Sequence, residues 1–150
     1  MTGKQKRIGK VIVHREKELD RRVVELGRAR AAAEEREAAL TAERQQLERA
    51  AAEREAMSER AMSAAEWREA NEWMQSRAQS TAVATREVER ANQQMEQTKT
   101  GVLTARRALK GVEMYEARLR VEEQKAEDKA DQRLQDDLAR GRSVSSRSKS

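Results

Sequence analysis

The sequence lacks proline, cysteine and phenylalanine, and its only aromatic residues are Trp67, Trp73 and Tyr115. Proline interrupts helices and phenylalanine fills compact cores, so the absence of both favours long, water-exposed helices over a globular domain. The absence of cysteine excludes a disulfide framework and thiolate chemistry, which fits a cytoplasmic protein. No apolar run approaches the roughly 20 residues that cross a bilayer, and none follows the basic start, so we expect no membrane span and no signal peptide.

Charged residues make up 39% of the chain, and their signs are unevenly distributed. Residues 1–30 carry ten Lys or Arg against four Asp or Glu, whereas residues 31–80 carry seven against eleven. Residues 81–140 balance at twelve of each, and the last ten add three basic residues and no acidic one. Together with many helix-favouring residues, this composition predicts a helical rod that is basic at both ends and acidic in the middle.

Two heptad patterns indicate coiled-coil helices. A largely apolar row recurs every seven residues: Ile12, Leu19, Leu26, Ala33, Leu40, Leu47, Arg54 and Ala61. Its companion row is half polar: Ile8, Arg15, Arg22, Ala29, Arg36, Glu43, Ala50, Met57 and Ala64. A second pattern starts at Val88 and continues through Met95, Val102 and Leu109, with mostly small companions such as Ala84 and Ala91. Because alanine contributes little burial energy, these patterns predict a thin, weakly stabilised seam.

The two patterns are out of phase, so the register breaks between them. Residues 67–81 include Asn71, Ser76 and Ser80 and lie near the midpoint, which predicts a turn there. The expected fold is all-α, a long antiparallel two-helix coiled-coil hairpin over residues 1–140, with similar arms at about 5–66 and 82–140 and a disordered basic C-terminal tail over residues 141–150. The alternative is a stutter in one continuous helix that pairs with another chain.

The sequence offers little for catalysis. His14 is the only histidine, which excludes a histidine-rich metal site, and its position on an expected helix favours a solvated side chain. Adjacent carboxylates such as Asp136 and Asp137 point apart on a helix, whereas acid–base catalysis needs groups that face each other across a cleft. No glycine-rich phosphate loop is present. We therefore expect a non-enzyme with no metal and no cofactor.

Nucleic-acid binding is the natural alternative for a basic chain. A basic-region zipper joins a basic helix to a strong heptad zipper. Here acidic residues such as Glu16 and Asp20 interrupt the basic region and would repel phosphates. This pattern argues against nucleic acid as a partner.

Trp67, Trp73 and Met74 stand out in the middle of the chain. Tryptophan and methionine are enriched in protein interfaces, which makes these three residues a candidate partner site near the turn. The alternative is that both tryptophans pack on the opposing arm.

Two segments carry a resemblance to a known family: HREKELDRRVVEL near the start and EEQKAEDKADQRLQDDLA over Glu122–Ala139. In the second, Glu123, Gln124 and Lys125 precede Asp136, Asp137, Leu138 and Ala139. The chain resembles the type III secretion central stalk proteins of the YscO/FliJ family. The serine-rich end after Gly141 and the half-polar row depart from that pattern.

The resemblance implies a non-catalytic, cytoplasmic stalk whose arm ends enter the central hole of a hexameric export ATPase. It also implies contacts with an export gate protein and with secretion chaperones. On this interpretation Lys10, Arg15, Arg21 and Arg22 face the ATPase, and Trp67, Trp73 and Met74 face another partner. Two alternatives stay open: a self-assembling structural coiled-coil dimer and a basic nucleic-acid-binding rod.

Overall fold

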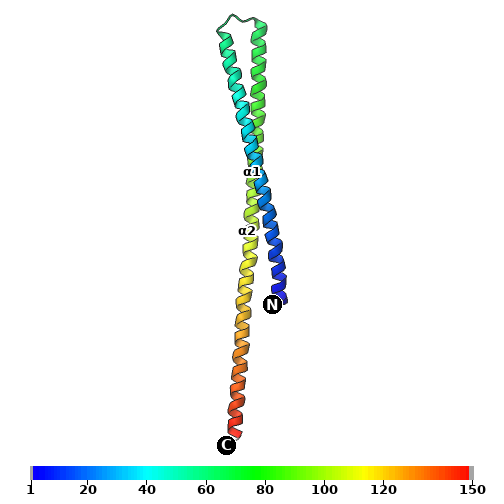
Figure 1. Ribbon diagram of the computed structural model, residues 1–150, viewed down its shortest axis with the longest axis vertical. Coiled ribbons are helices and arrows are strands. Elements are labelled where there is room, and N and C mark those ends of the chain that lie inside the picture. Colours follow the sequence, from blue (N-terminus) through cyan, green and yellow to red (C-terminus); the bar gives the residue numbers. More distant parts are fainter. Residues whose placement is uncertain (1, 149–150) are drawn as a thin grey trace. The chain divides into compact units, whose positions relative to one another are not determined.

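A computed structural model describes residues 2–148, with side chains through Arg142. Helix α1 spans Gly3–Ser58 and helix α2 spans Ala64–Ser148, and residues 59–63 connect them (Figure 1). The helices are antiparallel, which confirms the expected all-α two-helix hairpin. The pairing is made within one chain, so the seam of α1 does not require a second chain as the continuous-helix alternative did.

The chain divides into two compact units. Residues 19–105 form one, which we call the turn unit because it contains the connection between the helices. Residues 1–18 and 106–150 form the other, which we call the terminal unit. Each unit contains a segment of α1 and a segment of α2.

In the turn unit, the apolar heptad row of α1 faces α2 as its spacing predicts. Three members of this row, Leu26, Ala33 and Leu40, are buried. Leu40 forms a cluster with Ala84 and Val88 of α2. No described side chain is more than 98% buried. The seam is therefore thin, as the alanine-rich rows predict, and each aliphatic contact contributes a large share of its stability.

The turn lies earlier than expected. Residues 67–81 are helical and belong to α2, and the chain reverses over residues 59–63 instead. Ser63 caps the start of α2, since its Oγ accepts a hydrogen bond from the backbone N–H of Glu66 at 3.2 Å. A serine followed three residues later by glutamate is the sequence pattern of a helix start, and this signal outweighs the polar residues further on. The heptad row of Val88 continues back through Thr81 and Met74 to Trp67, so α2 keeps one register from its beginning.

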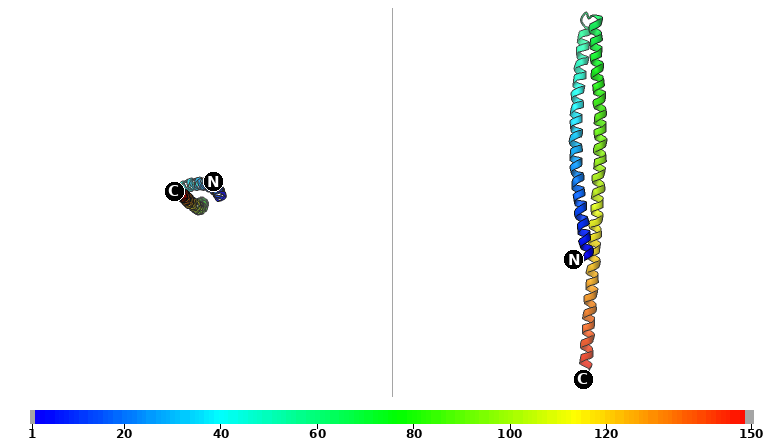
Figure 2. Two further views of the ribbon diagram at one scale, coloured as in Figure 1. Left: turned by 90° about the horizontal axis from the view of Figure 1, so that it is seen from below. Right: turned by 90° about the vertical axis from the view of Figure 1, so that its right-hand side faces the viewer.

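The arms are consequently unequal, with 56 residues in α1 and 85 in α2. In the terminal unit, the start of α1 lies beside Glu123, whose carboxylate accepts hydrogen bonds from the Thr2 hydroxyl at 2.9 Å and from the Gln5 amide. Beyond this point every described side chain of residues 124–142 is exposed. Figure 2 shows no other segment of the terminal unit beside this part of α2, which we call the overhang (residues 124–148).

The helix does not stop at Gly141. No glycine among the described residues has a positive φ, so Gly141 forms no left-handed cap, and the α2 backbone continues to Ser148. The rest of the expected disordered tail lies outside the described residues, namely residues 149–150 and the side chains from Ser143 onward.

Candidate partner-binding surfaces

The described residues form surfaces and open grooves and no enclosed catalytic cleft. No polar or charged side chain among them is buried. Within the same part of the chain, no three metal-binding side chains lie close enough together to hold an ion. Neither helix, over its described length, has a stretch that is apolar and long enough to cross a membrane. What this arrangement can do chemically is bind partners along the helix faces.

The four basic residues predicted to face the ATPase fall in both units. Lys10 and Arg15 belong to the terminal unit and are exposed. Arg21 and Arg22 belong to the turn unit, and each lies 3.8 Å from a carboxylate oxygen of Glu25. These pairs are partly exposed to water, so each contributes little to stability.

Arg22 differs from the other three because it packs on α2. A Cβ atom added to Gly101 would lie 3.7 Å from the Arg22 Cδ, so the arginine stem runs over this glycine. Arg22 is half-buried, whereas Lys10, Arg15 and Arg21 are exposed. A substitution at Arg22 therefore disturbs packing as well as charge.

Sequence reasoning missed a groove in the terminal unit. It has a volume of about 500 Å³ and lies between α1 and α2, with Arg15 and Arg107 among its polar residues. Its apolar lining comes from Ile8, Val11, Ala108, Gly111, Val112 and Tyr115. A Cβ atom at Gly111 would meet no atom within 4 Å, so this glycine leaves open space beside the groove. A glycine inside an expected helix, at position 111, was the sequence feature that could have indicated this groove.

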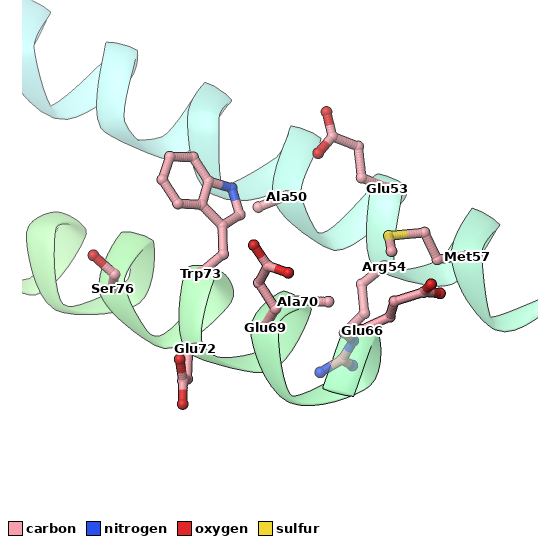
Figure 3. A pocket seen from close by; sticks show the side chains of 10 residues that line it. All are labelled: Ala50, Glu53, Arg54, Met57, Glu66, Glu69, Ala70, Glu72, Trp73 and Ser76. Carbon is pink, nitrogen blue, oxygen red and sulfur yellow. The ribbon is translucent and has the colours of Figure 1, made fainter. Parts of the chain in front are cut away.

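A second groove, which we call the turn groove, lies next to the connection between the helices and has a volume of about 620 Å³ (Figure 3). Its lining combines four apolar residues, four glutamates, one arginine and one serine: Ala50, Met57, Ala70, Trp73, Glu53, Glu66, Glu69, Glu72, Arg54 and Ser76. Figure 3 shows Glu53 and Glu72 projecting in opposite directions from α1 and α2, and Glu69 beside Trp73 between the helices.

The two tryptophans near this groove are held by arginines. The Arg77 guanidinium lies 4.8 Å from the centre of the Trp73 ring, and that of Arg54 lies 5.7 Å from the Trp67 ring. Arg77 also donates a hydrogen bond to the Gln46 Oε1 at 2.6 Å, and Arg54 donates one to Asn71. Such cation–π contacts fix the rings on the surface without burying them.

We call the part of the hairpin next to the connection between the helices the turn end. Of the three residues predicted to bind a partner there, only Trp73 lines the turn groove. Trp73 is 52% exposed and Trp67 is 40% exposed, whereas Met74 is half-buried in the seam. The methionine that lines the groove is Met57 of α1. The sequence could not identify Met57, because which residue of α1 lies opposite Trp73 depends on where the chain turns.

Two long antiparallel helices with a thin seam and open surface grooves define a coiled-coil protein that works through contacts. The chain belongs to the flagellar FliJ protein family, whose pattern matches residues 4–148. No significant match is found among curated proteins, and none among solved structures. The family assignment confirms the resemblance seen in the sequence.

Members of this family are non-catalytic stalks of the export ATPases of flagella and type III secretion systems. They bind the export ATPase and are cytoplasmic components of the export apparatus. The chain is accordingly a structural stalk and not an enzyme.

Proposed function

We propose that this chain is the stalk of a hexameric export ATPase. The basic N-terminal region of the stalk enters the central hole of the hexamer. The turn end then contacts a second component, an export gate protein or a secretion chaperone. The observation that carries this proposal is the separation of charge between the start of α1 and the residues on both sides of the turn. Residues 1–30 have ten basic residues against four acidic ones, and residues 31–80 have eleven acidic residues against seven basic ones.

The exposure of the basic side chains supports the ATPase contact. Lys10 and Arg15 are exposed, and Arg15 borders the apolar groove of the terminal unit. A groove with arginines at its edge suits an acid-lined pore that also presents apolar side chains. Charge attraction of this kind speeds association and selects the orientation of the stalk.

The test is stimulation of the hexameric export ATPase by the parent protein and by a Lys10→Glu, Arg15→Glu variant. We expect the variant to lose stimulation and binding at low salt while its circular dichroism stays helical, since neither side chain is buried. The matched control is Arg44→Glu, Arg49→Glu, which reverses two exposed charges of α1 outside the proposed site. Equal stimulation by both variants would refute the proposed ATPase contact.

A further inference from the structure

The turn groove has an apolar floor surrounded by carboxylates. Trp73, Met57, Ala50 and Ala70 supply the apolar surface from both helices. Glu53, Glu66, Glu69 and Glu72 also line the groove. No ion pair joins any of these four carboxylates to a basic residue in the described part of the chain.

The basic side chains nearest to this groove already have partners. Arg54 lies over Trp67 and donates a hydrogen bond to Asn71. Arg77 lies over Trp73, donates to Gln46 and pairs with Glu43 at 3.7 Å. The arginines therefore hold the tryptophans in place, and although Arg54 also lines the groove, neither arginine forms an ion pair with its four glutamates.

We propose that the turn groove binds a basic amphipathic helix of a partner protein. The apolar face of that helix packs on Trp73 and Met57, and its Lys or Arg side chains reach the glutamates on both sides. This inference rests on the proposed role of the turn end as the contact for a second component. Helices commonly bind grooves in this way, with anchors spaced three or four residues apart.

The dimensions of the groove suit a short helix. Along α1 its lining runs from Ala50 to Met57, about 10 Å at 1.5 Å per residue, and along α2 it runs from Glu66 to Ser76, about 15 Å. Two to three turns of a bound helix cover this length. Trp73 and Met57 fit the anchor role because an exposed indole offers a large rigid surface and a thioether adapts to its neighbour.

Charge decides between a basic partner helix and the other possible occupants. An acidic helix would place like charges against four glutamates. A second copy of this chain would have to present a segment that is both basic and apolar. The exposed apolar residues in the basic segment of α1 are Val11, Val13, Val23 and Val24, and no two of them have the spacing of three or four residues that anchors a helix in a groove. The groove therefore favours a separate partner with Lys or Arg beside its apolar face.

The probe is a synthetic amphipathic helix of about four turns with leucines on one face and lysines on its flanks. Its control is the same peptide with every lysine replaced by glutamate. Binding is measured by fluorescence anisotropy of the labelled peptide against the full chain. We expect the lysine peptide to bind, with affinity that falls as salt is raised, and the glutamate peptide not to bind.

Two variants test the groove itself. Trp73→Ala should weaken peptide binding about thirtyfold or more, as loss of an interface anchor does. Glu53→Gln, Glu69→Gln should weaken it several-fold and reduce its salt dependence. The matched control is Glu48→Gln, Glu55→Gln, which removes two exposed carboxylates of α1 outside the groove and should leave binding unchanged.

Folding is monitored by circular dichroism, and Trp73→Phe, which keeps an aromatic ring, should retain most of the affinity. Equal binding of both peptides, or equal effects of the groove and control variants, would overturn the inference. Occupation of the groove by a second copy would also overturn it, and would appear as concentration-dependent Trp73 fluorescence in a Trp67→Phe background without peptide.

The same variants separate this inference from the proposed function. The groove variants should stimulate the export ATPase as well as the parent protein does. Loss of peptide selectivity with intact stimulation refutes the groove inference alone. Absence of stimulation by the parent protein refutes the proposed ATPase contact, whatever the peptide does.

Discussion

At the scale of single residues, the polar positions in the seam are explained by partners on the other helix. Arg36 pairs with Glu87 at 3.0 Å, and Glu43 pairs with Arg77 at 3.7 Å. The sequence showed that these heptad positions are polar but not what they face, because the facing residue depends on the position of the turn. Glu43 and Arg77 are half-buried, so a shift of the helices that separates them is unfavourable, and such matched pairs favour one alignment of the helices over its neighbours.

The aliphatic positions, by contrast, could be predicted from spacing alone. We expect Leu40→Asp to lower the free energy of unfolding by more than about 3 kcal/mol, because it places a charge against Ala84 and Val88 where only 7% of Leu40 is exposed. The measurement is thermal and urea unfolding followed by circular dichroism.

The control for this substitution is Leu134→Asp in the overhang, where the leucine is 60% exposed. It should change the free energy of unfolding by less than about 0.5 kcal/mol. Similar losses for the two variants would mean that Leu40 does not lie in the seam.

A second residue-scale prediction concerns the start of α2. Replacing Ser63 by alanine removes the acceptor for the Glu66 backbone N–H, so we expect a loss of about 1 kcal/mol. Ser63→Asp keeps an acceptor and should be close to the parent protein. Urea unfolding of the two variants tests this, and equal stability of Ser63→Ala and the parent would show that the cap contributes nothing.

At the scale of elements, the sequence predicted the helices and their seam but not their lengths. The heptad rows around Leu40 and Val88 gave the correct faces. The turn at residues 59–63 was missed because Asn71, Ser76 and Ser80 resemble turn residues, although they are exposed or half-buried positions of one continuous helix. An error of several residues at the turn shifts every cross-helix pair, which is why the overhang and both grooves were not foreseen.

The overhang gives a prediction of its own. An isolated helix of this length is marginally stable in water, and the described side chains of residues 124–142 are all exposed. We therefore expect amide hydrogens of the overhang to exchange much faster than those around Leu40 and Val88. Hydrogen exchange with mass spectrometry measures this in the free protein. Equal protection of both regions would contradict the expectation that the overhang is a helix without packing partners.

At the scale of the whole molecule, function follows from the family assignment and from the surfaces that the two helices present. The two helices meet in a thin seam and carry open grooves on their surface. The family assignment supplies the ATPase as one partner. The sequence alone supplied the charge pattern that distinguishes the basic start of α1 from the acidic residues near the turn.

The two contact regions should therefore be separable in one assay. We expect a Trp67→Ala, Trp73→Ala variant to stimulate the export ATPase like the parent protein, because neither tryptophan belongs to the basic region of α1. Stimulation by both proteins should fall as salt rises from low to physiological strength, where charges are screened over about 8–10 Å. ATPase turnover at several salt concentrations measures both effects.

The helicity of the variant is checked by circular dichroism, since each tryptophan holds an arginine of the seam. The variant Lys10→Glu, Arg15→Glu, Arg21→Glu, Arg22→Glu reverses four charges of the basic region. In contrast to the tryptophan variant, we expect it to stimulate the ATPase at no salt concentration. A folded tryptophan variant that no longer stimulates the ATPase would mean that the turn end also contacts it. Stimulation that does not change with salt would mean that apolar contacts, and not the basic residues, hold the stalk in the hexamer.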